Sequence, residues 1–250
     1  DMVSQAGTMA IAGLLPVVHS FACFLTSRAS EQIYNNCTEK QKIIYVGSLA
    51  GLLPSGPGHS HQAVRDVIAM SAMPGIKIIE PVNSKQVKAA LEWAVRTNTS
   101  SSYLRLTSIP YENINIQNIS SDLIEGRGEI VSGERGDVVL VTAGPIMTEI
   151  SMSIALKLQE RGYAVQVIST AWLNCIDIDW YKEQLRDSKV ILTIENSYVE
   201  RGFGSWFISQ LAIASVEVAT RSEIIGLNEV PTCGTANEVL EYHGLDEDSI

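Results

Sequence analysis

Two of the chain's four histidines, His59 and His61, lie two residues apart in the glycine- and proline-rich segment 56–62. An imidazole with an ordinary pKa of about 6.5 can move a proton at neutral pH or hydrogen-bond a developing alkoxide. The glycines of the segment allow the backbone and the imidazole to approach a ligand closely. The same residues also fit a tight turn that carries two surface histidines, and local features leave both interpretations open.

The runs on either side of this segment would place it at the edge of a sheet. Run 42–47 is rich in β-branched residues and predicts a buried strand. Run 62–70 repeats apolar residues at helical spacing, with Val64, Val67 and Ile68 on one face. A loop between a strand and a helix offers backbone amides at the carboxyl end of a parallel sheet, so the three runs together predict a ligand site there.

The composition is that of a globular chain. With 250 residues, of which 46% are hydrophobic and 18% charged, the chain is long enough for two ordinary domains. Its net charge of −10 disfavours nucleic acid as a partner, because neutralising phosphates requires clustered Lys and Arg. No apolar run reaches the length of a membrane-spanning helix, so a membrane is not expected as a partner either.

Four cysteines, Cys23, Cys37, Cys175 and Cys233, are far apart and form no C-x-x-C pair. This spacing predicts reduced structural thiols in a cytoplasmic protein rather than a zinc site or a disulfide framework. Neither Cys175 nor Cys233 has a basic neighbour in the sequence to activate it, so we expect both side chains to be buried.

The apolar runs predict an α/β fold made of two tandem, doubly wound parallel-sheet units. In the first unit we expect one helix to end at Gly13 and another to begin with Ser84 as its N-cap. Strands are expected at 14–21, 42–47, 76–81, 103–106, 137–142, 164–168, 189–195 and 216–220. Helices are expected at 2–12, 24–34, 62–70, 85–96, 147–160, 180–187, 204–214 and 236–242. We place the domains at 1–112 and 127–250, with 113–126 as the linker.

Short segments along nearly the whole chain match, in order and spacing, those of one enzyme family. Among them are Phe21-Ala22-Cys23-Phe24-Leu25, Ser48-Leu49-Ala50-Gly51-Leu52, Gly58-His59-Ser60-His61-Gln62, Ile79-Glu80-Pro81, Tyr103-Leu104-Arg105-Leu106, and Glu195-Asn196 followed by Gly202-Phe203-Gly204-Ser205. In this arrangement the chain resembles the second half of a transketolase-type, thiamine-diphosphate-dependent enzyme. The corresponding parts are the later portion of the pyrimidine-binding domain, which lacks its start here, and the transketolase C-terminal domain.

The resemblance implies thiamine diphosphate and Mg²⁺ as cofactors. It also implies a reaction in which a two-carbon unit passes from a keto donor to an aldehyde acceptor. In this family, aromatic side chains at the positions of Phe21 and Phe24 pack on the aminopyrimidine ring, so both are predicted to bind the cofactor. Two core phenylalanines at a strand end are the alternative interpretation.

Three residues are predicted to contact the substrate. His61 matches the family's histidine in the pattern Thr or Ser, His, Gln, which implies a catalytic and substrate-binding role near the reacting carbon. His59 is a further substrate-binding candidate, although the family usually has a small residue there. Arg105 matches a strand-end arginine that can hold a phosphate or carboxylate, with a surface or interdomain salt bridge as the alternative. No metal ligand is predicted.

Two residues depart from the pattern of sugar-phosphate transketolases. Those enzymes commonly have a histidine at the position of Leu49 and an aspartate at the position of Pro57, and both side chains hydrogen-bond sugar hydroxyls. The departures imply a more apolar pocket. We therefore expect a less hydroxylated donor or acceptor, as in a specialised biosynthetic pathway.

Two parts of the family's site are not found in the chain. The family's catalytic glutamate would precede Asp1, and the Gly-Asp-Gly pattern followed by Asn that holds Mg²⁺ and the diphosphate is absent. We therefore expect the chain to be inactive without a diphosphate-binding domain. That domain would lie on the same long polypeptide or on an N-terminal partner subunit, in a homodimer or a heterotetramer.

The C-terminal unit offers little chemistry of its own. Glu195 and the helix start at 202–205 form a possible anion site, while support of dimer packing is the expected role of the unit. Two other functions stay open for the whole chain. One is a β-type component of a 2-oxo-acid dehydrogenase, and the other is a non-catalytic assembly module.

Overall fold

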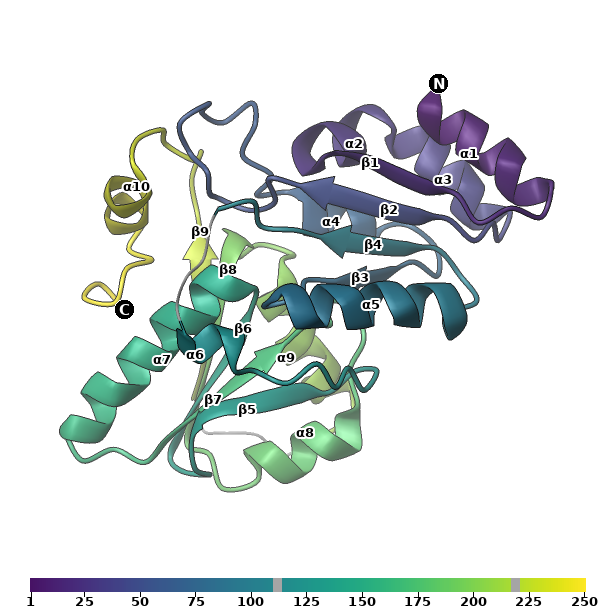
Figure 1. The fold of residues 1–250 in the computed structure, drawn as a ribbon. Coiled ribbons are helices and arrows are strands. Elements are labelled where there is room, and N and C mark those ends of the chain that lie inside the picture. The colour runs from purple at the N-terminus through teal and green to yellow at the C-terminus, as the bar shows by residue number, and fades with distance from the viewer. Residues whose placement is uncertain (110–113, 217–220) are drawn as a thin grey trace.

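The chain folds into two α/β units, drawn one above the other in Figure 1. This computed structural model describes residues 1–109, 114–216 and 221–250. The first unit is built on a parallel sheet with the strand order β1-β2-β4-β3. Its elements are α1 (Met2–Ile11), β1 (Val17–Phe21), α2 (Ala22–Arg28), α3 (Ser30–Thr38), β2 (Ile44–Ser48), α4 (Asp66–Ser71), β3 (Lys77–Ile79), α5 (Ser84–Arg96) and β4 (Ser102–Arg105).

Helices cover both faces of the first sheet, and successive side chains of its central strands point to opposite faces. Tyr45 and Tyr103 pack in one cluster with apolar residues of α1, α2, α3 and α4. Ile44 and Leu104, from the same two strands, pack against α5 on the other face. Because β2 and β4 are buried on both faces, their sequences are nearly continuous apolar runs rather than alternating ones.

The second unit has the strand order β5-β7-β6-β8-β9, in which β5 is antiparallel to β7 and the other pairs are parallel. Val139 and Val141 face α8 and α9, while Leu140 faces α7 on the opposite side. Its elements are α6 (Ile114–Gln117), β5 (Gly128–Gly133), β6 (Val138–Ala143), α7 (Pro145–Glu160), β7 (Val165–Thr170), α8 (Ile178–Leu185), β8 (Val190–Tyr198), α9 (Phe203–Ile213), β9 (Arg221–Leu227) and α10 (Ala236–Tyr242). Within the described ranges, no helix is long and apolar enough to cross a membrane.

The two sheets confirm the predicted α/β class, and several local predictions are wrong. The expected buried strand 14–21 is the edge strand β1, in which Val17 is 58% exposed. The expected helix 24–34 is divided at Ala29 into α2 and α3. Asn83 rather than Ser84 caps α5, because the Asn83 side chain accepts a hydrogen bond from the backbone N–H of Gln86.

Two other expectations concern the second unit. The antiparallel strand β5 was not expected from the sequence, since its residues 128–133 show no long apolar run. Of the expected strand 216–220, residues 217–220 lie outside the described part of the chain.

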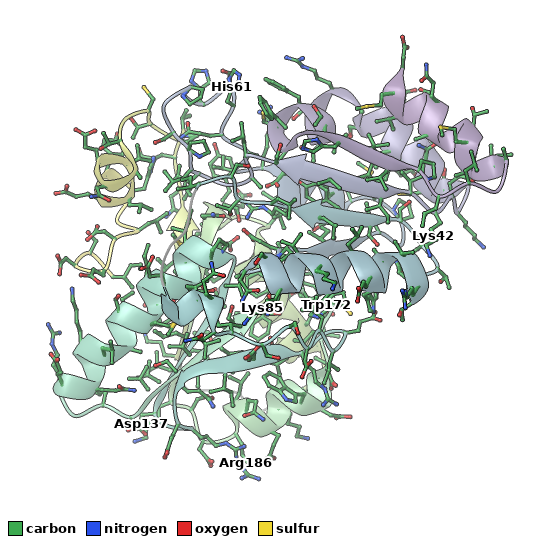
Figure 2. All side chains as sticks on the ribbon, viewed as in Figure 1. Lys42, His61, Lys85, Asp137, Trp172 and Arg186 are labelled. Carbon is green, nitrogen blue, oxygen red and sulfur yellow. The ribbon has the colours of Figure 1, made fainter. Side chains whose placement is uncertain are left out.

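The two units are joined by backbone hydrogen bonds next to β3. The N–H of Glu80 donates to the carbonyl of Ala171 at 2.8 Å, and the N–H of Leu173 donates to the carbonyl of Ile78 at 3.0 Å. Between them, Trp172 is 1% exposed and meets Trp93 of α5 edge to face, with 4.8 Å between the ring centroids. Figure 2 shows Trp172 beside α5, where the first unit meets the second.

A buried ion-pair network also spans this contact. Arg105 Nε lies 3.0 Å from Asp66 Oδ2, and its Nη1 lies 2.5 Å from Glu80 Oε1 and 2.9 Å from Asn196 Oδ1 of the second unit. The Tyr103 hydroxyl donates to Asp66 Oδ2 at 2.7 Å. Burial alone would lower the pKa of Arg105, but the two carboxylates outweigh it and raise that pKa, so the guanidinium stays charged.

Two glycines allow the units to approach this closely. A Cβ atom at Gly51 would overlap the side chain of Asn196, and a Cβ atom at Gly144 would overlap the carboxylate of Glu80. Both glycines also have a positive φ, which other residues adopt only with strain. The contact therefore depends on the absence of a side chain at these two positions.

Replacing Arg105 with Met should lower the free energy of unfolding by about 3–5 kcal/mol, because it leaves the buried carboxylates of Asp66 and Glu80 without their cation. The matched control is Arg135→Met. Arg135 pairs with Glu183 at 3.0 Å on the surface, and its loss should cost less than about 1 kcal/mol. Urea unfolding of both variants measures the difference, and equal losses would show that the buried network contributes no more than a surface pair.

Candidate functional site

Phe21, Phe24 and His61 form an aromatic cluster at the carboxyl ends of β1 and β2. Phe21 is the last residue of β1, Phe24 lies in the first turn of α2, and His61 lies on the loop between β2 and α4. Ring centroids are 6.0 Å apart for Phe21 and Phe24, 5.0 Å for Phe24 and His61, and 6.5 Å for Phe21 and His61. Because β1 and β2 are parallel neighbours, the segments that follow them leave the sheet at the same edge.

His61 is half-buried, and its ring meets the Phe24 ring edge to face at 69°. Its Nδ1 lies 3.0 Å from Ser60 Oγ, a contact that fixes the orientation of the imidazole. Figure 2 shows His61 on the loop that extends beyond the end of the first sheet, between α2 and α10. His59, on the same loop, is exposed to solvent.

A cleft of about 260 Å³ opens beside Phe24. Ser20, Arg28 and Gln32 contribute polar groups to its lining, and Asp1 lies at the same cleft. The Arg28 guanidinium carbon lies 4.1 Å from the centroid of the Phe24 ring, a cation–π contact. Sequence reasoning missed this arginine as a site residue, although its spacing of four from Phe24 on one helix was a usable signal.

The loop 49–65 between β2 and α4, which we call the histidine loop, is hydrogen-bonded to the second unit. Gln62 is 4% exposed, and its Nε2 donates to the carbonyl of Leu52 at 3.0 Å and to the carbonyl of Thr232 at 2.9 Å. Ser55 Oγ donates to the carbonyl of Gly234 at 2.8 Å. Gln62, which directly follows His61, thus bonds to both Leu52 of the loop and Thr232 of the second unit. Together with Ser55 it joins the loop to segment 232–234.

A buried histidine stands behind this segment. His243 Nε2 accepts a hydrogen bond from the backbone N–H of Thr232 at 3.1 Å, and its side chain is 1% exposed. Burial lowers the pKa of His243, against the opposing effect of Glu229, whose Oε1 lies 3.8 Å from Nδ1. The neutral imidazole is the form that can accept from Thr232, so its protonation would remove the acceptor.

Arg105 lies apart from the aromatic cluster. Its guanidinium is 1% exposed and bound by Asp66, Glu80 and Asn196, as described above. The interdomain salt bridge, which was the alternative interpretation, is therefore the one that its contacts describe. Its Nη2 has no hydrogen-bond partner among the described residues, and substrate binding by Arg105 stays a prediction.

The position of Glu195 argues against the possible anion site in the C-terminal unit. Its buried carboxylate accepts hydrogen bonds from the backbone N–H groups of Phe203 at 3.0 Å and Gly204 at 2.8 Å, and from the Ser197 hydroxyl. Burial raises the pKa of Glu195, and these donors oppose the rise. The N-terminus of α9 is therefore occupied by the chain's own carboxylate, which leaves no room for an external anion.

The cysteines divide into two groups. Cys23 and Cys37 are buried, as expected of structural thiols. The prediction that Cys175 and Cys233 are buried is wrong, since Cys233 is exposed and Cys175 is partly exposed beside a lysine. Among the described residues, no group of three or more His, Cys, Asp or Glu side chains is arranged to hold a metal ion.

Comparison with known proteins agrees with the fold. The family model "Transketolase, pyrimidine binding domain" matches residues 1–112, and "Transketolase, C-terminal domain" matches residues 126–250. The chain is 26% identical to a 1-deoxy-D-xylulose-5-phosphate synthase of Clostridium kluyveri, over 99% of its own length and 39% of the synthase. It is 25% identical to one subunit of the apulose-4-phosphate transketolase of Actinobacillus succinogenes, over 100% of its own length and 79% of that subunit.

A solved structure gives the same picture. A structure described as a split gene transketolase, an inactive beta4 tetramer, superposes with a TM-score of 0.87 at 27% identity. The match covers 99% of this chain and 78% of that one. The chain thus spans most of the split subunits it matches, but well under half of the synthase.

Replacing Gln62 with Leu should loosen the histidine loop, because the carbonyls of Leu52 and Thr232 lose their buried donor at a cost of about 1–3 kcal/mol. We expect amide hydrogen exchange within residues 52–62 to become about tenfold faster or more, with little change in the central strands. The control is Gln41→Leu, since Gln41 Nε2 bonds only to the nearby carbonyl of Glu39. Equal exchange in both variants would contradict the role given to Gln62.

The lowered pKa of His243 predicts a stability that depends on pH. Because the unfolded chain binds this proton more readily, the contribution is present above the unfolded pKa of about 6.5 and is lost as pH falls through the folded pKa. In His243→Gln, the amide oxygen can accept from Thr232 without titrating. Between neutral and mildly acidic pH, the wild-type protein should therefore lose more unfolding free energy than the variant, as measured by urea unfolding. A constant difference would rule out the linkage.

Proposed function

This chain belongs to the transketolase family, and we propose that it is the pyrimidine-binding and C-terminal subunit of a split transketolase. The family consists of thiamine-diphosphate-dependent transferases. In the proposed reaction, a two-carbon unit passes from a keto donor to an aldehyde acceptor. The relatives support this proposal, since a transketolase subunit and a split gene transketolase match the chain over 99–100% of its length.

The aromatic cluster is the observation that carries the proposal. Phe21 is 41% exposed and Phe24 lines a cleft, so both present ring surface to a ligand rather than to the core. A flat heteroaromatic ring is the group that such a surface binds best, and the aminopyrimidine of thiamine diphosphate is one. Ser20 and Gln32 at the same cleft are able to hydrogen-bond the polar edge of that ring. The residues present therefore fit the pyrimidine half of the cofactor.

The bound cofactor supplies a nucleophilic carbon and an electron sink. This chain would present the rings of Phe21 and Phe24 to the pyrimidine and direct His61 at the substrate. The imidazole of His61 would hydrogen-bond the oxygen on which charge develops, or transfer its proton. Gln62 and Ser60 keep that imidazole in place by fixing the loop and the Nδ1 position. His59 remains a proposed substrate contact at the exposed part of the same loop.

The diphosphate, Mg²⁺ and the catalytic glutamate would come from the N-terminal subunit. The two chains would form a heterotetramer, while a homodimer applies if both halves lie on one polypeptide. We place the proposed domain boundaries at residues 112 and 127, with the linker between them. In this arrangement the present chain is inactive alone.

The proposed substrate is less hydroxylated than a pentose phosphate. Leu49 directly follows β2 and is half-buried near the cluster, and its backbone N–H is held by Ser108 Oγ at 2.9 Å. Pro57 is exposed on the histidine loop. Neither side chain can hydrogen-bond a sugar hydroxyl, as histidine and aspartate would at these positions.

Reconstitution tests the proposed function. The chain is co-expressed with the polypeptide encoded directly upstream, and turnover of keto donors is measured with and without thiamine diphosphate and Mg²⁺. Cofactor-dependent transfer to an aldehyde supports the proposal, whereas oxidative decarboxylation onto a lipoyl carrier supports the 2-oxo-acid dehydrogenase alternative. No turnover and no cofactor-dependent thermal shift would indicate an assembly module.

Two substitutions in the reconstituted enzyme should separate binding from chemistry. Phe24→Ala should weaken cofactor binding about 10- to 100-fold through lost ring packing. His61→Asn should leave cofactor affinity nearly unchanged and reduce kcat/KM about 10²- to 10⁴-fold. Titration calorimetry and steady-state kinetics measure the two effects. Tyr163→Ala, which removes an exposed aromatic ring in the other domain, is the control and should change neither.

The substrate proposal has its own test. Xylulose 5-phosphate and ribose 5-phosphate should be turned over poorly by the reconstituted enzyme, and Leu49→His should improve their kcat/KM by restoring a hydrogen-bonding side chain. Steady-state assays with deoxy and hydroxylated donors measure the ratio. Pentose phosphate activity equal to that of a housekeeping transketolase would contradict the proposal of a less hydroxylated substrate.

A further inference from the structure

Three side chains from distant parts of the sequence meet on the surface where the two units join. Lys77 belongs to β3 of the first unit, Glu125 precedes β5, and Cys175 lies between β7 and α8 of the second unit. Lys77 Nζ lies 2.7 Å from Glu125 Oε1 and 3.6 Å from Cys175 Sγ, and the Cys175 thiol lies 3.4 Å from the same Glu125 oxygen. An amine, a thiol and a carboxylate thus form a closed triangle.

The backbone around this triangle is fixed. Asn174, next to Cys175, accepts from the N–H of Ile78 at 2.8 Å and donates to the carbonyl of Ile76 at 2.8 Å. These two bonds lie on either side of Lys77 and act like one additional strand contact. The segment that carries Cys175 is therefore fixed against β3 beside Lys77.

The triangle is also open to small molecules. The side chain of Lys77 is 29% exposed and that of Glu125 is 42% exposed, and Cys175 is partly exposed. A peroxide molecule can reach the sulfur from solvent, whereas Cys23 and Cys37 are buried.

We propose that Lys77 and Cys175 form an oxidation-dependent covalent link in which one oxygen atom joins the lysine nitrogen to the cysteine sulfur. Hydrogen peroxide is the oxidant. The Cys175 sulfur attacks one peroxide molecule, breaking its O–O bond, and becomes a sulfenic acid with release of water. After the Lys77 ammonium has lost one proton to solvent, its amine attacks a second peroxide molecule, releases water and becomes a hydroxylamine. The two hydroxyl groups then condense, losing a third water and leaving the S–O–N link.

The electrons balance in this sequence. Sulfur and nitrogen are each oxidised by two electrons, and the two peroxide molecules are reduced to water. Glu125 accepts the proton that the thiol loses, since its Oε1 already receives that hydrogen bond. Two equivalents of a dithiol return the four electrons and regenerate the thiol and the amine.

The resting charges make the site slow to react without sustained oxidant. Burial raises the pKa of Cys175, although Lys77 opposes the rise. Burial alone would lower the pKa of Lys77, but its hydrogen bond to Glu125 outweighs burial and raises that pKa. At neutral pH the thiol and the ammonium are therefore the main forms, and both are poor nucleophiles.

The link would join the two domains covalently at the contact that aligns them. It would tie β3 of the first sheet to the segment after β7 of the second, beside the backbone bonds of Ile78 and Glu80. Oxidation would then add a covalent tie to the domain contact, and reduction would remove that tie.

The experiment treats the purified protein, together with its partner subunit where one is present, with hydrogen peroxide. Intact mass spectrometry should show the gain of one oxygen and the loss of two hydrogens. Digestion with a protease that does not cut at lysine should yield a peptide pair joined through Lys77 and Cys175. Dithiothreitol should reverse both signals, and the oxidised protein should unfold at a higher temperature than the reduced one.

Variants assign the chemistry. Lys77→Arg keeps the cation and the Glu125 pair but should abolish the link, as should Cys175→Ser, while Glu125→Gln should slow it. Cys233→Ser removes the exposed cysteine and should leave the link unchanged. Circular dichroism checks that each variant is folded.

Two results would overturn the proposal. One is a mass gain at Cys175 that is equal in the wild-type protein and in Lys77→Arg, because Lys77 would then take no part. The other is oxidation of Cys233 with Cys175 unmodified, because the thiol would then be inaccessible despite its partial exposure.

Discussion

Arg105 pairs with the buried carboxylates of Asp66 and Glu80 at the contact between the two units. Removing a guanidinium and two carboxylates from water costs several kcal/mol per ion, so the charges persist in the interior only where each finds its partners. Asp66 begins α4, Glu80 follows β3 and Asn196 belongs to β8 of the second unit. One guanidinium therefore fixes the end of the histidine loop, the edge of the first sheet and the position of the second unit.

Both units contribute to the candidate site, the first with its aromatic rings and the second with hydrogen bonds to the loop. The first unit supplies every ring of the cluster, because Phe21, Phe24 and His61 all follow strands that end at one edge of its sheet. The second unit supplies no ring, yet Thr232 receives the hydrogen bond of Gln62 next to His61. The C-terminal domain thus helps to order the loop that carries His61.

The sequence predicts the parallel strands and a ligand site after the strand at 42–47, because short apolar runs and the carboxyl-end rule are local signals. The roles of Phe21, Phe24 and His61 come from the family resemblance and stay predictions. The environment of Arg105 was not predictable in the same way. Its partners Asp66 and Glu80 lie 39 and 25 residues away, and nothing in the sequence near Arg105 distinguishes a buried cation from one that awaits a substrate.

The surroundings of Cys175 also depend on a contact between residues far apart in the sequence. It has no basic residue nearby in sequence, but Lys77, 98 residues earlier, lies beside it in the fold. Similarly, the helix start at α9 has the appearance of an anion site until Glu195 is seen to occupy it from β8. In each case the pairing of charges across the fold, rather than the residue type, decides the role.

The hydrogen bond from Gln62 to Thr232 couples the opening of the histidine loop to the separation of the two units. If opening the loop breaks a bond to the second unit, then separating the units also frees the loop, and the two events share one coupling free energy. By reciprocity, any ligand that orders the loop must strengthen the contact between the domains by the same factor. A substitution that changes this coupling would then change the affinity of the site and the stability of the domain contact together.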